Sequence, residues 1–221
     1  MRLAATAISS ALLLLAVAAQ AEPVRRGVQV QGSLGLSDCT GGACSNGDEL
    51  RFYNTRIALG LEASGWYRPV PLFSVGGGLH YNILGLRDRD RVTSDGDYWS
   101  FEIGGRVHPL QHGPLDAWGG LGVGYMAYSI SSDFTDMNIQ EDESTNAVFF
   151  AVSVGAEWYL APRMSVGGLF QIAFPSWMTQ CLDTELGHDC DDVSDQPDSV
   201  QRDYPTTVWF MGGTFSYHLG G

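Results

Sequence analysis

The chain has 221 residues, with 25 Asp or Glu against 12 Arg and no Lys, so its formal net charge is −13. A chain this acidic is a poor partner for nucleic acid, whose phosphates require a basic face. Glycine is abundant, at 28 residues, and no segment carries an apolar stripe with the 3.6-residue helical period. These features predict an all-β fold.

The N-terminus has the three parts of a secretory signal peptide. Arg2 supplies a positive charge, residues 11–19 form an apolar core, and Ala19-Gln20-Ala21 matches an A-x-A cleavage site. The alternative is a membrane anchor, but the apolar run is too short to span ~30 Å of hydrocarbon. We therefore predict that residues 1–21 are a cleaved signal peptide. Residues 22–221 have the length of one domain.

Eight runs alternate between two kinds of side chain, which is the period of a β-strand. In the sixth run, Phe150 and Val152 lie on one face, and Ser153 and Glu157 lie on the other. The other runs likewise have one bulky apolar face and one small or polar face. The predicted strands are residues 27–37, 51–63, 71–84, 97–108, 116–130, 147–160, 164–174 and 205–219.

The connections between these strands alternate in length. The short ones are residues 64–70, 109–115 and 161–163, and the long ones are residues 38–49, 85–96, 131–146 and 176–203. In an antiparallel meander, all short connections then lie at one end and all long ones at the other. An even number of strands with this layout is typical of an outer-membrane barrel, which turns its apolar face to lipid. The alternative is a secreted soluble barrel with the bulky face inside and a ligand bound there.

Aromatic residues gather near both ends of the predicted strands, as expected for girdles at the two headgroup levels. The alternative is that they are ordinary core aromatics. Near the short turns are Trp66, Tyr67, Trp118, Trp158 and Tyr159, and near the long loops are Tyr53, Tyr81, Trp99, Phe149, Phe174, Trp177 and Tyr204.

The signal peptide, the eight amphipathic strands and the alternating connection lengths resemble the small OmpA- and OmpX-type outer-membrane barrels. The resemblance covers the whole mature chain. It implies an eight-stranded antiparallel up-and-down transmembrane β-barrel in the outer membrane of a Gram-negative bacterium. We expect a monomer in contact with outer-membrane lipid, with its long loops outside the cell and available to an extracellular ligand or surface partner.

The polar faces of the strands predict a charged barrel interior. Such charges must be paired or hydrated, so a network that plugs the lumen is favoured over a catalytic or conducting site. The inward glycines Gly76, Gly78, Gly104, Gly120, Gly122 and Gly124 leave open thin water-filled gaps and hence a narrow pore. The predicted interior network consists of Arg56, Glu62, His80, Glu102, Arg106, Glu157, Gln171 and His218.

Two long loops carry the four cysteines, as Cys39 with Cys44 and Cys181 with Cys190. An even number of cysteines in an exported protein indicates disulfides. Pairing within each loop is favoured because short rings close easily, and a cross-loop pairing such as Cys39 with Cys181 is the alternative. A metal site is not favoured because neither pair has C-x-x-C spacing.

The third and fourth long loops are strongly acidic. Carboxylate-rich loops can bind Ca²⁺, although no spacing here matches an EF-hand. A hydrated anionic surface is the favoured interpretation, and no other cofactor is predicted. The weak Ca²⁺ candidates are Asp189, Asp191, Asp192 and Asp195.

Enzymatic activity is the third of three functional hypotheses. Asp88 and Asp90, with the pair His188-Asp189, resemble the layout of the ten-stranded omptin proteases, but a hydrated charged loop is favoured. No Ser-His-Asp triad is evident. A structural or interaction barrel that displays acidic, disulfide-bearing loops ranks first. A narrow channel for small solutes ranks second, and a membrane enzyme acting on lipid or protein at the rim ranks third.

Overall fold

The computed structural model describes residues 23–40, 55–86, 92–134, 139–184, 187–196 and 204–220. The predicted signal peptide, Cys44, Tyr53, Asp88 and Asp90 lie outside these ranges. The elements of the described chain are β1 (Gly27–Thr40), β2 (Thr55–Val70), β3 (Phe73–Leu86), β4 (Val92–His112), β5 (Leu115–Phe134), β6 (Ile139–Ala161), β7 (Met164–Thr184), β8 (Gly187–Asp192), the 3₁₀ turn η2 (Val193–Asp195) and β9 (Thr207–Leu219).

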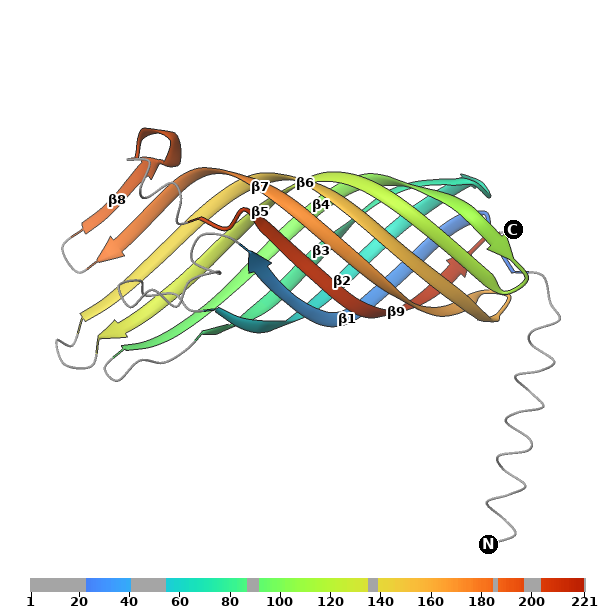
Figure 1. Cartoon of the computed structure of the whole chain (residues 1–221), viewed down its shortest axis with the longest axis horizontal. Helices are drawn as coiled ribbons and strands as arrows, with labels where there is room; N and C mark the ends of the chain where they lie inside the picture. The colour runs from blue at the N-terminus through green and yellow to red at the C-terminus, as the bar shows by residue number, and fades with distance from the viewer. Residues whose placement is uncertain are drawn as a thin grey trace, which may run out of the picture.

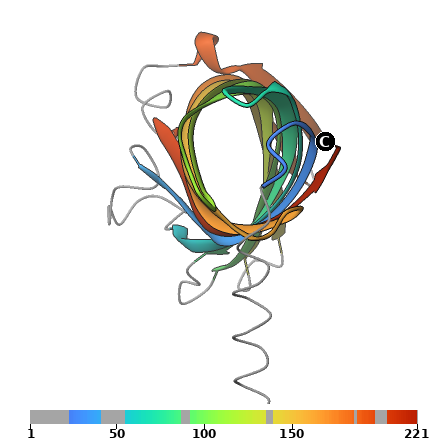
Figure 2. The same cartoon turned by 90° about the vertical axis from the view of Figure 1, so that its right-hand side faces the viewer.

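Eight of these strands close into a ring. Strands β1 to β7 pair with their neighbours in sequence, β7 pairs with β9, and β9 pairs with β1, all antiparallel. Figures 1 and 2 show the barrel from the side and along its axis. The short strand β8 is not part of the ring and pairs with the far end of β7. The predicted eight-stranded up-and-down barrel is confirmed.

The two faces of each strand explain why the sheet closes in this way. The large apolar side chains of the predicted outer face, such as Leu34, Ile103 and Val154, point outward and are 37–64% exposed. A continuous apolar surface around the whole barrel is stable in lipid and not in water. The predicted orientation is confirmed, and the soluble-barrel alternative is wrong.

The short turns lie at one rim, together with the start of β1 and the end of β9 (Figure 1). At Gly113 the chain turns tightly with φ +55°, which glycine adopts without strain. We call this end the short-turn rim and the opposite end the long-loop rim.

Strands β4 to β7 have 20–23 residues, whereas β1, β2, β3 and β9 have 13–16. The additional length rises beyond the rest of the barrel at the long-loop rim (Figure 1). We call residues 92–95, 131–134, 139–146 and 179–184, with β8, the tall wall. The prediction of loops at residues 131–146 and 176–203 is therefore wrong over much of the described range. In sequence, these segments are mostly polar at odd and even positions alike, so they lack the apolar alternation that marks a strand. They pair through backbone hydrogen bonds.

Candidate functional site

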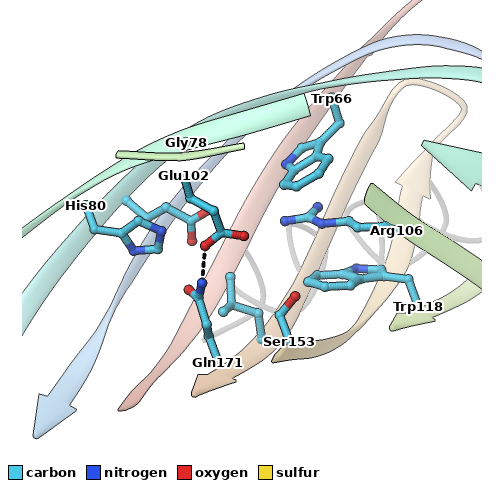
Figure 3. Close-up of a pocket in the computed structure, with 10 residues that line it drawn as sticks. Trp66, Gly78, His80, Glu102, Arg106, Trp118, Ser153 and Gln171 are labelled. Carbon is cyan, nitrogen blue, oxygen red and sulfur yellow. Dashed lines mark hydrogen bonds between the residues drawn. The ribbon is translucent and has the colours of Figure 1, made fainter. Parts of the chain in front are cut away.

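The centre of the barrel lumen is closed by one arginine held between two indole rings. The guanidinium carbon of Arg106, on β4, lies 3.6 Å from the centre of the Trp66 ring and 3.7 Å from that of Trp118. Figure 3 shows the three groups stacked across the lumen. A cation on the face of an indole is attracted by the ring quadrupole, and more strongly so where water is excluded. We call these three residues the Arg106 sandwich.

Glycines on neighbouring strands make room for these large side chains. A Cβ added at Gly155 would lie 2.5 Å from Cζ2 of Trp118, and one at Gly122 would overlap Oε1 of Glu102. At Gly124 it would overlap Cζ of Phe149. The interpretation of Gly122 and Gly124 as water-filled gaps is therefore wrong, because side chains from adjacent strands fill the space.

Hydrogen bonds tie the sandwich to polar groups around it. Arg106 donates to Oε1 of Gln31 at 3.0 Å, and Gln171 donates to the carboxylate of Glu102 (Figure 3). Glu62 accepts from the Ser33 hydroxyl at 2.9 Å. The cavity among these groups has a volume of about 10 Å³. That is the space of about one water molecule.

A second polar group surrounds Glu157, nearer the short-turn rim. Gln29 donates to Oε1 of Glu157 at 2.6 Å, and Ser216 donates to the same oxygen at 2.9 Å. Ser165 donates to Oε2 at 3.1 Å, and Nε2 of His218 lies 3.8 Å from that oxygen. Both oxygens of this buried carboxylate therefore have partners, as a buried charge requires.

A third group forms a linear relay beside the short turns. Nε2 of His108 lies 3.0 Å from the Ser74 hydroxyl, and Nδ1 lies 3.0 Å from Oδ1 of Asp116. Arg68 donates to the other Asp116 oxygen at 2.5 Å. The order Ser-His-Asp is that of a hydrolytic triad. However, Ser74, His108 and Asp116 are only 1–3% exposed, and Ser74 lines neither lumen cavity. The relay is therefore buried, and its hydrogen bonds link β3, β4 and β5.

The long-loop half of the lumen has a different filling. A cluster of buried apolar residues closes it, and Tyr128 and Trp177 pack on top. The rings of Tyr98 and Tyr128 stack with centroids 4.8 Å apart. The cavity below is about 20 Å³ in volume. We call the cluster the apolar plug; its buried members are Tyr98, Met126, Ala147, Phe149, Ala151, Ala173 and Val208.

Residues 7–176, most of the chain, match the family model described as outer membrane protein beta-barrel domain. The chain belongs to this family. The predicted resemblance and the outer-membrane location in Gram-negative bacteria are thereby confirmed. No curated protein sequence matches the chain.

Solved structures of outer-membrane barrels share the fold at low sequence identity. The major outer membrane protein of Thermus thermophilus has a TM-score of 0.60 at 14% identity, over 87% of this chain and 100% of that one. Neisserial surface protein A has a TM-score of 0.57 at 9% identity, over 87% and 97%. OprG of Pseudomonas aeruginosa has a TM-score of 0.54 at 12% identity, over 89% and 99%. Such likeness supports the fold alone. Among the described residues, no helix is long and apolar enough to cross a membrane.

The outer-membrane barrel holds seven of the predicted interior residues in its lumen, in two separate groups. Glu62, His80, Glu102, Arg106 and Gln171 lie around the sandwich, whereas Glu157 and His218 lie nearer the short turns. The side chain of Arg56 lies outside the described part of the structure.

Sequence reasoning missed Gln29, Gln31, Arg68, His108 and Asp116 as members of these groups. Arg68 continues the inward alternation of Glu62, Ser64 and Trp66, but the predicted second strand ends at residue 63. The structure extends that strand to Val70. Following the alternation through the predicted turn would have found Arg68.

The predicted aromatic girdles need correction. Trp66, Trp118, Phe149 and Tyr159 are buried in the lumen. They follow the inward parity of their strands, which proximity to a rim does not change. Trp177 and Tyr204 are partly buried and stack on each other, with centroids 5.5 Å apart. The outward aromatics that remain are Tyr67 and Trp158 near the short turns, and Tyr81, Trp99 and Phe174 toward the long-loop rim.

The tall wall carries a disulfide between Cys181 and Cys190. Cys39 is also disulfide-bonded, so the alternative pairing of Cys39 with Cys181 is wrong. His188 hydrogen-bonds Asp183 rather than its sequence neighbour Asp189.

The structure does not bring the four Ca²⁺ candidates together. Asp189, Asp191 and Asp192 lie in β8, where Asp189 and Asp191 share one face and Asp192 lies on the other. Asp195 follows in η2. Within the described ranges, the metal-capable cluster is Cys181, His188 and Cys190, whose two sulfurs are bonded to each other. That cluster offers no thiolate to a metal.

Proposed function

We propose that this outer-membrane barrel is a non-conducting scaffold that displays the tall wall outside the cell for interaction with a partner. The observation that supports a closed scaffold is the double closure of the lumen. The Arg106 sandwich leaves a cavity of about 10 Å³ and the apolar plug one of about 20 Å³. Each has room for about one water molecule, which is too little for a hydrated solute.

The charge of the tall wall indicates the class of partner. From residue 139 to residue 196 the chain contains one arginine, Arg163, which lies in a turn at the opposite rim. The same stretch carries exposed carboxylates at Asp142, Asp183, Asp189 and Asp191. A surface of one sign attracts partners of the other, so we infer a cationic partner, such as a basic peptide or a basic protein surface.

A polyanion is the opposite case. The barrel named Ail of Yersinia pestis has been solved in complex with the heparin analogue sucrose octasulfate, with a TM-score of 0.51 at 12% identity over 87% of this chain and 99% of that one. The carboxylates of the tall wall would repel such a ligand here. The shared fold therefore does not carry over that ligand class.

Single-channel recording in planar bilayers tests the closed lumen. The wild-type barrel is expected to give no discrete current steps. A variant with Trp66→Ala, Arg106→Ala, Trp118→Ala and Phe149→Ala, which removes the sandwich and the largest residue of the plug, serves as the open control. Discrete steps from the wild-type barrel would overturn the proposal in favour of a narrow channel.

Binding to immobilised barrel tests the displayed surface. Oligolysine is expected to bind at low ionic strength and to dissociate as salt screens the carboxylates. Replacing Asp189, Asp191 and Asp192 by Asn should weaken that binding, whereas sucrose octasulfate should not bind either form. Equal binding of oligolysine to wild type and variant would overturn the proposal that the carboxylates of β8 contact a cationic partner.

A further inference from the structure

The ribbon formed by β7 and β8 carries two disulfide-bonded cysteines, a histidine and an aspartate on one face. The register pairs Cys181 with Cys190 and Asp183 with His188. Residues two apart on a strand share a face, so the disulfide, the imidazole and the carboxylate lie together. Figure 1 shows this ribbon at the outer end of the tall wall, far from both chain ends.

Short distances join these groups into a second relay, which we call the His188 relay. Nδ1 of His188 lies 2.5 Å from Oδ1 of Asp183, and Nε2 lies 3.1 Å from Sγ of Cys190. Because a carboxylate only accepts, Nδ1 carries the hydrogen, and the bond fixes the ring with Nε2 toward the sulfur. The imidazole is thus oriented toward one particular atom of the disulfide.

The His188 relay is open to solvent, unlike the polar groups of the lumen. The side chains of His188 and Asp183 are 61% and 57% exposed. Cys190 is exposed and Cys181 is half-buried. Small thiols in solution can therefore reach the disulfide, and no requirement to satisfy buried polar atoms explains why these groups meet.

We propose that the Cys181–Cys190 disulfide is a thiol-exchange site in which His188 protonates the Cys190 sulfur as it leaves. An external thiol gives its proton to Nε2 of His188, and its thiolate attacks Sγ of Cys181. The bond between the two cysteine sulfurs breaks, and its electron pair goes to Sγ of Cys190. The His188 imidazolium stabilises this thiolate and gives it a proton. A better-stabilised leaving sulfur departs faster.

A second external thiol completes the two-electron reaction. Its thiolate attacks the external sulfur of the mixed disulfide, which releases Cys181 as a thiol. Two external thiols are thereby oxidised to one disulfide, and the Cys181–Cys190 bond is reduced to two thiols. The reverse sequence lets the reduced site take up oxidising equivalents from an external disulfide.

The surrounding charges select the class of thiol. Among the described residues, the charged groups that share this face with the disulfide and His188 are Asp183 on β7, Asp192 two residues beyond Cys190 on β8, and Asp142 opposite Asp183 on β6. All of them are carboxylates. A cationic thiol is therefore attracted to the site and an anionic thiol is repelled, by an effect that falls as salt is added.

The rate of reduction tests the proposal in the intact barrel. Reduction by 2-mercaptoethanol is followed by alkylating the released thiols and mapping the labelled peptides by mass. His188→Asn is expected to slow reduction of the Cys181–Cys190 bond about tenfold, because no side chain then carries a proton to the leaving sulfur. Asp183→Asn should slow it less, because the imidazole remains. The disulfide that contains Cys39 is the internal control, and its rate should not change.

Two results would overturn the proposal. One is an equal rate of reduction of the Cys181–Cys190 bond in wild type and in His188→Asn, with each variant shown to be folded by heat-modifiable gel mobility. The other concerns the mixed disulfide trapped by acid quench: it should lie on Cys181, and an adduct found mainly on Cys190 would reverse the assigned leaving group.

A series of thiols tests the selectivity. At low ionic strength, 2-mercaptoethylamine should reduce the bond faster than 2-mercaptoethanol, and 2-mercaptoethanesulfonate more slowly, after correction for each reagent's thiolate fraction. The differences should shrink as salt is added. The opposite order would contradict the assigned role of the carboxylates.

Discussion

The two halves of the lumen are built from strands of the same period and parity, yet they are closed by different forces. The short-turn half is closed by directional bonds, in the Arg106 sandwich, the Glu157 group and the Ser74–His108–Asp116 relay. The long-loop half is closed by the apolar plug. Alternation thus determines which side chains point into the barrel, but it does not determine whether they are polar or apolar. Removing a charge from the polar half should leave unpaired groups, whereas trimming the plug should leave a void.

The largest effect is expected from Arg106→Met. The change removes the cation from between the two indoles and leaves Glu62 and Glu102 without it in a nearly closed cavity. Loss of one partner from a buried charged network costs about 3–5 kcal/mol. The free energy of unfolding of vesicle-inserted barrel, measured in urea by tryptophan fluorescence, should fall by that amount. Arg163→Met, in an exposed turn, is the matched control and should change it by less than about 0.5 kcal/mol. Equal effects of the two changes would refute the role of the sandwich.

Phe149→Ala should destabilise the long-loop half by about 3 kcal/mol, because it opens a void in the apolar plug. Its neighbour Phe150 points outward and is 44% exposed to the lipid side, so Phe150→Ala leaves no void and should cost less. The same urea measurement compares the two. A larger loss for Phe150→Ala would contradict the assignment of the plug as the closure of this half.

Gly155→Ala tests how tightly the sandwich is packed. The new methyl group would lie 2.5 Å from Cζ2 of Trp118 and 3.0 Å from a backbone oxygen, so the indole must move. Overpacking of this kind costs about 1–3 kcal/mol. The outward-facing Gly168 is the control, since its nearest neighbour would lie at 3.6 Å. If both alanine variants have wild-type stability, the sandwich is packed less tightly than the structure shows.

The smallest effect concerns Tyr204, at the long-loop rim above the plug. Its hydroxyl donates to Oε1 of Gln180 at 2.5 Å, and its ring stacks on Trp177. Burial first, and then the nearby Glu143 carboxylate, raise the pKa of Tyr204 to about 12. Because the phenol of an unfolded chain ionises near pH ~10, the stability that depends on the neutral phenol is present below pH ~10 and is lost as the pH rises toward 12.

A difference titration measures this ionisation. The tyrosinate absorbance of wild type minus that of Tyr204→Phe should have its midpoint near pH 12. A midpoint near pH ~10, the ordinary value for tyrosine, would show that the ring is more open to water than its contacts indicate.

Sequence reasoning predicted the barrel because lipid imposes a strict rule on the outer face, and Phe150, Val152 and Val154 obey it in every second position. The interior has no such rule. Glu157 and Phe149 have the same inward parity, yet Phe149 was predicted to be part of an aromatic girdle. Alternation also does not separate a polar half of the lumen from an apolar one. Trp66 and Trp118 lie near a rim in sequence and were predicted to be part of an aromatic girdle at the headgroup level, whereas their parity directs them at Arg106.

Contacts between strands that are far apart in the sequence could not be predicted either. Arg106 and Gln31 are 75 residues apart, and Gln29 and Glu157 are 128 residues apart. Only the closed ring with its particular register brings them together. The tall wall was missed for a different reason: its sequence is mostly polar at odd and even positions alike, so no apolar alternation marks its strands.

Strand β8 has one more consequence, for the solubility of the tall wall. Strand β9 pairs with β7 only from Met164 to Ala173, so the upper part of β7 would otherwise present unpaired backbone groups to other molecules. Exposed edges of this kind template intermolecular β-pairing. Strand β8 covers Thr179–Thr184 and carries Asp189, Asp191 and Asp192 in six residues. The new outer edge is thus short and negatively charged, two features that oppose pairing with the sheet of a neighbouring copy.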